Sequence, residues 1–170
     1  MGLGADVIVP GGRAALGYGE MLLKGLKASD FARMPAGVKT NHPAFCFGHL
    51  AIYPDRILEM VGRGDLARPE ARFVELFSAG KECVDDPAGT IYPAMDEIAS
   101  RYRERYGVLL QAILEVPDGI FAQKNPNERM VERFPTLGAL VPFMVCGHCM
   151  VHHGQVSAWR RMMGYGSAVS

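Results

Sequence analysis

The sequence has no excess of charge of either sign and no long hydrophobic run. Its 18 lysine and arginine residues balance its 18 aspartate and glutamate residues. Nucleic acids and anionic membrane surfaces attract proteins with a basic surplus, so we expect neither kind of partner. The longest apolar runs, such as residues 137–146, are too short for a transmembrane helix.

The N-terminal sequence also lacks targeting features. No basic region precedes an apolar segment, as it does in a secretory signal peptide. The opening Met1-Gly2-Leu3-Gly4-Ala5-Asp6 lacks the serine or threonine of a myristoylation signal. We therefore expect a cytoplasmic protein.

Cysteine is scarce, with four residues at positions 46, 83, 146 and 149. They are too few and too scattered for a disulfide framework in a chain of this length. Cys146-Gly147-His148-Cys149 has the form of the redox motif of protein disulfide isomerases, but that interpretation requires a thioredoxin fold. The short remainder of the chain has a helical pattern instead, so we expect buried, unreactive thiols.

Apolar residues recur every three or four positions in four long segments, which predicts four amphipathic helices. The expected ranges are about 13–32, 41–62, 93–115 and 136–163. Asn41 is a candidate N-cap for the second helix, Pro54 should kink or divide it, and Pro142 should bend the last helix. Residues 1–12 are expected to form a flexible lead-in and residues 165–170 a tail.

With 170 residues, the chain has room for a single domain with one sizeable core. Four long amphipathic helices in one domain predict an all-α four-helix bundle over residues 1–170. The long connection over residues 63–90 can cross the length of a helix, and a short helix at 71–77 would account for its length. Helices 2 and 3 can therefore run parallel, which gives an up-down-down-up topology.

Two histidines near the C-terminus, His148 and His152, lie one helical turn apart within an apolar stripe that runs from Leu137 to Met162. Two imidazoles so placed can converge on one metal ion, and a buried pair needs some such partner. His49, on the apolar face of the second helix, is the natural third imidazole. The pattern therefore predicts a three-histidine site for a divalent metal.

Two short motifs resemble those of the DinB/YfiT-like superfamily. They are Asn41-His42-Pro43-Ala44-Phe45 with Gly48-His49-Leu50, and His148-x3-His152-His153-Gly154-Gln155 followed by Arg160-Arg161-Met162-Met163-Gly164. The resemblance extends from the first helix to Gly164. It implies an up-down-down-up four-helix bundle, often dimeric, in which three histidines hold a divalent metal, here His49, His148 and His152.

The cysteines near these histidines depart from the family pattern. Cys146 and Cys149 flank His148, where thiols are not expected, and Cys46 lies one turn before His49. If a cysteine joined the three histidines, the site would become a closed, four-coordinate structural zinc site. Cys46 also fits as a small core residue, which is the interpretation that we favour.

Three imidazoles leave a divalent ion with an open position for water or substrate, and their softness favours zinc or nickel. The resemblance implies metal-assisted hydrolysis, or transfer or isomerisation with a low-molecular-weight thiol as cosubstrate. The expected partners are a second copy of the chain, forming a homodimer, and a thiol or another small-molecule substrate. One alternative is a non-catalytic, stress-related dimeric bundle whose metal is structural. A DNA-associated function is suggested only by the superfamily's name and is opposed by the neutral charge.

Two further residues are candidates for catalysis. Gln155 lies about one helical turn after His152. It either hydrogen-bonds a metal-bound water or caps a buried carbonyl group. Arg56, two turns after His49, either holds a substrate anion or is solvated or ion-paired, and the second is the more common state of arginine.

Other ring-bearing residues receive less specific predictions. Tyr53 and Tyr102 are expected in the core, with substrate contact as the alternative, and Trp159 is expected to pack. His42 and His153 are expected to be surface or capping residues.

Overall fold

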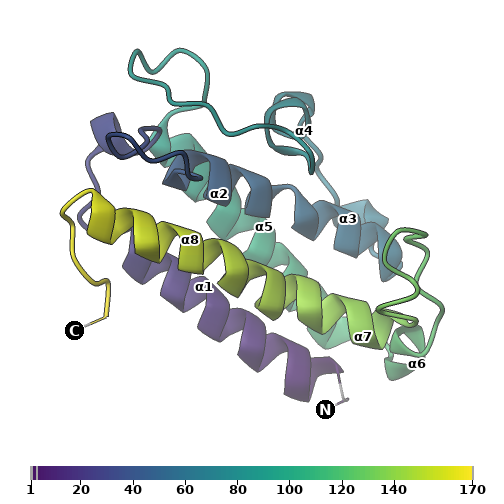
Figure 1. The fold of residues 1–170 in the computed structure, drawn as a ribbon. Coiled ribbons are helices and arrows are strands. Elements are labelled where there is room, and N and C mark those ends of the chain that lie inside the picture. The colour runs from purple at the N-terminus through teal and green to yellow at the C-terminus, as the bar shows by residue number, and fades with distance from the viewer. Residues whose placement is uncertain (1, 3, 170) are drawn as a thin grey trace.

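The computed structural model describes residue 2 and residues 4–169, and its regular elements are helices (Figure 1). No β-strand occurs among these residues, although Lys124 and Thr136 form an isolated bridge. The prediction of an all-α chain is therefore confirmed. Met1, Leu3 and Ser170, which belong to the predicted lead-in and tail, lie outside the described residues.

The described residues form the following α-helices: α1 (Val9–Leu23), α2 (Pro43–Ala51), α3 (Tyr53–Met60), α4 (Ala71–Phe77), α5 (Met95–Glu115), α6 (Asp118–Phe121), α7 (Leu137–Pro142) and α8 (His148–Met162). Two π-helical turns precede α1 and α8: η1 (Gly4–Ile8) and η4 (Phe143–Gly147). Two short 3-10 turns lie in the connections: η2 (Ala28–Asp30) and η3 (Gly64–Leu66). None of the helices in this described part of the chain is long and apolar enough to cross a membrane.

The first helix begins and ends earlier than the sequence predicted. Because η1 and α1 together cover residues 4–23, residues 4–12 belong to the first helix rather than to a flexible lead-in. Pro10 is compatible with the first turn, where its missing N–H would have no partner. Gly12 permits close packing, since an added Cβ would lie 2.4 Å from Leu110 and 2.6 Å from Val145.

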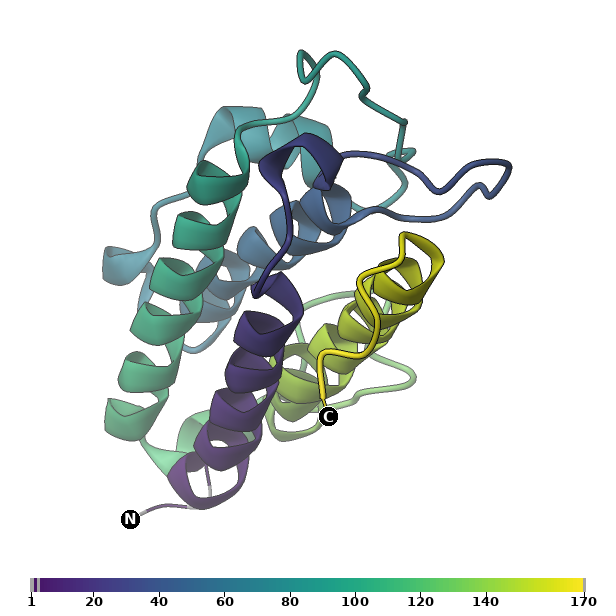
Figure 2. The same ribbon diagram turned by 90° about the vertical axis from the view of Figure 1, so that its left-hand side faces the viewer.

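The long helices pack around a shared core. α2 contacts α5 and α8, α1 contacts the same two helices, and α3 continues along α5. Figure 2 shows α1 between α5 and α8, and α4 lies against α2 (Figure 1). Phe47, Tyr102 and Trp159 are fully buried among these helices. The predicted packing of Trp159 and the predicted core position of Tyr102 are therefore confirmed.

Prolines interrupt two of the predicted helices, as expected. Pro54 stands in the first turn of α3, and the helix is divided at Ile52, between α2 and α3. Pro142 ends α7, and η4 follows before α8 begins at His148. Turns of the π type are frequent at functional sites. These interruptions place His49 in the last turn of α2 and His148 at the first residue of α8.

The N-cap of α2 is His42, so the prediction of Asn41 as the cap is wrong. The Nδ1 atom of His42 accepts the backbone N–H of Phe45 at 3.2 Å. Its Nε2–H then donates to the carbonyl of Val84 at 2.9 Å. Since both ring nitrogens have partners, the ring can be fully buried, and it is. The side chain of Asn41 is thereby released for a contact near the histidine cluster.

A buried ion cluster joins α3 to α5. Asp55 is 2 % exposed, and its carboxylate accepts Nε of Arg105 at 2.8 Å and Nη2 of Arg101 at 3.2 Å. The backbone N–H of Arg68 also donates to this carboxylate, at 3.0 Å. One buried carboxylate shared by two guanidinium groups thus fixes α3, the helix that follows His49 in the chain.

Candidate metal centre

Three histidines from two helices meet between α2 and α8. The ring centroids of His49 and His152 are 4.7 Å apart, as are those of His148 and His152, and those of His49 and His148 are 5.3 Å apart. One ligand nitrogen from each ring lies within 4.8 Å of the others. The structure therefore brings together the three residues that the sequence singled out as metal ligands.

Hydrogen bonds to the protein orient two of the rings. Nδ1 of His49 donates to the carbonyl of Phe77, the last residue of α4, at 2.6 Å. Nδ1 of His152 donates to Oε1 of Gln155 at 3.0 Å. Each bond fixes the ring proton on Nδ1 and leaves Nε2 as the unprotonated nitrogen, which is the form that binds a metal.

The Nε2 atoms of His148 and His152 face each other at 3.1 Å. Zinc–nitrogen bonds of about 2.0–2.1 Å in a tetrahedral arrangement put two ligand nitrogens about 3.3 Å apart, so this spacing suits two ligands of one ion. The buried Nδ1 of His148 has no hydrogen-bond partner among the described residues. Because the bond to Gln155 leaves Nε2 of His152 unprotonated, Nε2–H of His148 donates to it in the metal-free protein, and a bound cation would take the place of that proton.

Burial keeps these imidazoles neutral. It lowers the pKa of His49 to about 4 and that of His148 to about 3, and it also lowers the pKa of His152. At His49 the charges of His152 and Arg56 lower the pKa further, whereas the hydrogen bond to Phe77 raises it. Metal binding requires neutral imidazole, so at neutral pH the rings need not release protons first.

Gln155 orients His152 through its side-chain carbonyl. Its Oε1 atom also accepts Nδ2 of Asn41 at 3.1 Å and the thiol of Cys46 at 3.4 Å. Three donors therefore hold the amide in place, which in turn fixes the imidazole of His152. The sequence predicted Gln155 as a partner of a metal-bound water or of a buried carbonyl group, and the structure shows a contact with His152 instead.

The nearby thiols are engaged outside the histidine cluster. Cys46 is fully buried, donates to Gln155, and has a pKa raised by that burial. Cys149 donates to the hydroxyl of Tyr106 at 2.9 Å, and burial raises its pKa to about 12. Both thiols are therefore protonated at neutral pH, whereas zinc binds a thiolate. The candidate ligand group found in the described residues consists of the three histidines.

Tyr53 and Arg56 form a wall beside the cluster. The Tyr53 ring lies edge-on to His49 at 4.9 Å between centroids and to His148 at 4.8 Å. The guanidinium carbon of Arg56 lies 5.2 Å from the centroid of Tyr53, and its Nη2 donates to Oγ of Ser78 at 3.3 Å. Tyr53 is thus half-buried against two of the candidate ligands.

His153 is fully buried, so the prediction of a surface or capping residue is wrong. Its Nε2 lies 3.1 Å from the hydroxyl of Tyr102, and its ring contacts Tyr18 and Phe47. Burial lowers its pKa to about 4. Neighbouring residues of an α-helix point about 100° apart, which places His153 in the core while His152 faces α2.

Two contacts that orient the rings were missed by the sequence analysis. The predicted short helix at 71–77 is confirmed as α4, but a backbone carbonyl such as that of Phe77 has no sequence signature. Asn41 stood in a recognised motif and was interpreted as a helix cap. The structure gives the cap position to His42, and the side chain of Asn41 donates to Gln155 instead, a role that its motif did not indicate.

Replacing Gln155 with leucine removes the acceptor of the His152 Nδ1 proton. We expect about 10- to 100-fold weaker zinc binding, the usual consequence of losing an orienting partner of a ligand histidine. Gln111→Leu, at an exposed position of α5, is the matched control and should bind zinc normally. Competition with a chromophoric chelator measures both affinities, and equal values for the two variants would contradict the orienting role.

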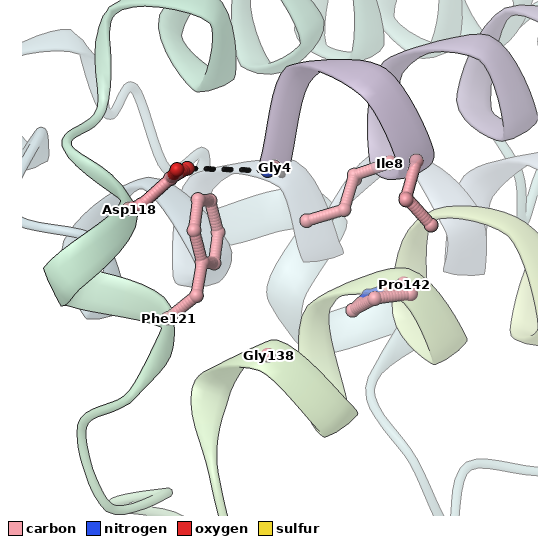
Figure 3. A pocket seen from close by; sticks show the side chains of 7 residues that line it. Gly4, Ile8, Asp118, Phe121, Gly138 and Pro142 are labelled. Carbon is pink, nitrogen blue, oxygen red and sulfur yellow. Dashed lines mark hydrogen bonds between the residues drawn. The ribbon is translucent and has the colours of Figure 1, made fainter. Parts of the chain in front are cut away.

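A separate cavity of about 130 Å³ lies beside η1 and α7 (Figure 3). Its lining includes Ile8, Phe121 and Pro142, and Asp118 in the same wall accepts the N–H of Gly4 at 3.4 Å. This cavity shares no lining residue with the histidine cluster. Because its walls are apolar apart from one carboxylate, the histidine cluster is the better candidate for chemistry.

The chain matches no family model, no curated protein and no solved structure. The resemblance to the DinB/YfiT-like superfamily therefore stays a prediction that rests on its two motifs.

Proposed function

We propose that this chain is a cytoplasmic, metal-dependent enzyme of the DinB/YfiT-like superfamily that uses zinc or nickel to activate water or a thiol. The observation that carries the proposal is the meeting of three neutral imidazoles, two of which have Nδ1 engaged by the protein. The proposed partners are a second copy of the chain and a low-molecular-weight thiol or another small-molecule substrate.

The helix directions support the proposed up-down-down-up bundle. In Figure 1, α1 and α8 run in one direction, and α2, α3 and α5 run in the opposite direction. The connection through α4 returns the chain along α2, which allows α3 and α5 to be parallel. This arrangement is the one that the superfamily resemblance implies.

A divalent ion held by three imidazoles supplies a Lewis acid with open positions, able to lower the pKa of a water molecule or a thiol. His49, His148 and His152 are the residues that would hold it. The Phe77 carbonyl and Gln155 orient two of the rings, and burial keeps all three neutral at the pH of the cytoplasm. The half-buried Tyr53 ring packs edge-on against His49 and His148.

The second candidate function is a bundle whose metal is structural. Structural zinc sites are closed by four protein ligands, whereas the candidate group in the described residues has three members, His49, His148 and His152. Cys46 is the residue suggested as a fourth ligand, and its thiol donates a hydrogen bond to Gln155. A three-residue ligand group favours the catalytic proposal.

Metal analysis of the purified chain tests the proposal. We expect about one zinc or nickel ion per chain, and its loss in His49→Ala and in His148→Ala, because two imidazoles bind a metal far more weakly than three. His153→Gln changes a buried histidine outside the cluster and should retain the ion. An equal metal content in all four proteins would refute the proposed site.

Activity assays on the loaded protein then separate the two functions. Activated esters report hydrolysis, and electrophiles that react with a low-molecular-weight thiol report transfer. A loss of at least about 1,000-fold in His148→Ala supports catalysis through the site. The structural alternative is supported if the metal only raises the melting temperature. In that case the spectrum of the cobalt-substituted protein should not change when small ligands are added, because no coordination position is open.

A further inference from the structure

Arg56 lies beside the histidine cluster and next to an apolar groove. We propose that Arg56 forms an anion subsite there, and that the substrate is a small carboxylate with a short apolar chain. This inference rests on the proposed function, because it places the carboxylate next to the proposed metal.

The charge of Arg56 is not neutralised by an ion pair. Among the described residues, no carboxylate lies within 4.0 Å of its guanidinium group. Its contacts are the Tyr53 ring and the hydroxyl of Ser78, which itself donates to the carbonyl of Val74 at 2.6 Å. A guanidinium group has five N–H donors, so most of them remain for a ligand.

The same charge acts on the histidine cluster. The guanidinium carbon of Arg56 lies 5.2 Å from the centroid of the Tyr53 ring, and that ring contacts both His49 and His148. A divalent ion among the three imidazoles adds charge of the same sign next to a half-buried guanidinium group, and this repulsion is unfavourable. An anion that lies between the ion and Arg56 is attracted by both.

Three acidic residues belong to a second groove beside Arg56. Asp55, Glu59 and Glu70 line that groove together with Arg56. Asp55 and Glu70 are already paired with Arg101, each at 3.2 Å. Among the described residues, Glu59 forms no ion pair with the Arg56 guanidinium group within 4.0 Å. The guanidinium group of Arg56 is therefore available to bind an anion on the side that faces Tyr53.

An apolar groove of about 50 Å³ adjoins Arg56 and Tyr53. Its other apolar walls come from α3, the 122–136 connection, α7 and η4: Ile57, Met60, Met130, Leu140 and Met144. The Tyr53 ring links the groove to the cluster, because it also contacts His49 and His148. A water-sized group needs about 10–15 Å³ of such space, so the groove accepts about four carbon atoms.

Cobalt-substituted protein tests the subsite, with acetate, pentanoate and pentanol as probes. The visible spectrum reports cobalt binding and changes when an anion enters the surroundings of the ion. We expect pentanoate to bind at least about tenfold more tightly than acetate, because it buries three more methylene groups. Pentanol has the same chain without the charge and should leave the spectrum unchanged.

Arg56→Gln should weaken pentanoate binding at least about tenfold, and Arg56→Lys should restore part of the loss.

Arg72→Gln is the matched control, since Arg72 is an exposed arginine of α4 that pairs with Glu97 at 3.7 Å. Its pentanoate affinity should equal that of the unaltered protein. The subsite would be refuted if Arg56→Gln bound pentanoate as tightly as the unaltered protein, or if acetate and pentanoate bound equally. Cobalt binding would in either case still support the metal site. Failure of the unaltered protein to bind cobalt would instead refute the proposed function, and the inference with it.

Discussion

Replacing Asp55 with alanine is expected to lower the free energy of unfolding by about 3–5 kcal/mol. Asp55 and Arg105 are each 2 % exposed, and the Asp55 carboxylate is the shared partner of Arg105 and Arg101. Its removal takes the buried carboxylate away from both guanidinium groups and leaves Arg105 with the exposed Glu104 at 3.5 Å and Arg101 with Glu70 at 3.2 Å. The hydrogen bond from the Arg68 N–H is lost as well. Urea denaturation at pH 7.5 measures the change.

Asp65→Ala is the control for this substitution, because Asp65 is exposed and pairs with Arg63 at 3.4 Å. An exposed pair contributes little, so we expect a change of less than about 1 kcal/mol. Adding Arg105→Leu to Asp55→Ala removes the buried guanidinium group that has lost the Asp55 carboxylate. The double variant should therefore recover part of the lost stability. Similar effects of Asp55→Ala and Asp65→Ala would show that the buried cluster is not a main support of α3.

The metal-free protein is expected to lose about 6 kcal/mol of its free energy of unfolding between pH 7.5 and pH 5. Burial lowers the pKa values of His49 and His153 from 6.5 to about 4, and that of His148 to about 3. As the pH falls through about 6.5, these histidines take up protons in the unfolded chain but not in the folded one. The unfolded state then binds more protons, and each of the three costs about 2 kcal/mol of stability at pH 5.

His153→Gln separates the histidine effect from the titration of carboxylates. His153 is fully buried and lies outside the metal cluster, so its replacement should remove about 2 kcal/mol of the pH dependence. Chemical denaturation of both proteins at the two pH values gives the four free energies needed. If the two proteins showed the same pH dependence, protonation of His153 in the unfolded state could not be a source of the acid sensitivity.

Much of the candidate site could be predicted because its determinants are local. His148 and His152 are one turn apart in any helix, and Pro54 interrupts a helix whatever surrounds it. His49 was assigned from its place on an apolar face and from the resemblance. The helix at 71–77 was predicted from its position in a connection too long to be structureless.

The residues that orient the site were not predictable, because their roles depend on tertiary contacts. The Phe77 carbonyl reaches His49 only because α4 packs against α2. Asn41 looks like a helix cap until the neighbouring His42 takes that position, buried under the 84–92 connection. Gly12 lets α1 pack closely on α5 and η4, because its missing side chain leaves room for Leu110 and Val145. Phe77, Val84, Leu110 and Val145, which decide these roles, are all distant in the sequence from the residues that they contact.

The π-helical turn η4 has a consequence for where the histidine pair points. Such a turn takes up about one more residue than an α-helical turn, and one residue corresponds to about 100° of rotation. After this turn, Cys149 and Val156 of α8 are buried, whereas Val151 and Met162 are 57 % and 44 % exposed. A homologous chain with one residue deleted from 143–147 would keep both histidine codons and the same hydrophobic pattern. Its two imidazoles would nevertheless be rotated about the helix axis by about 100°, away from His49. The spacing of the two histidines alone would therefore not identify a working metal site.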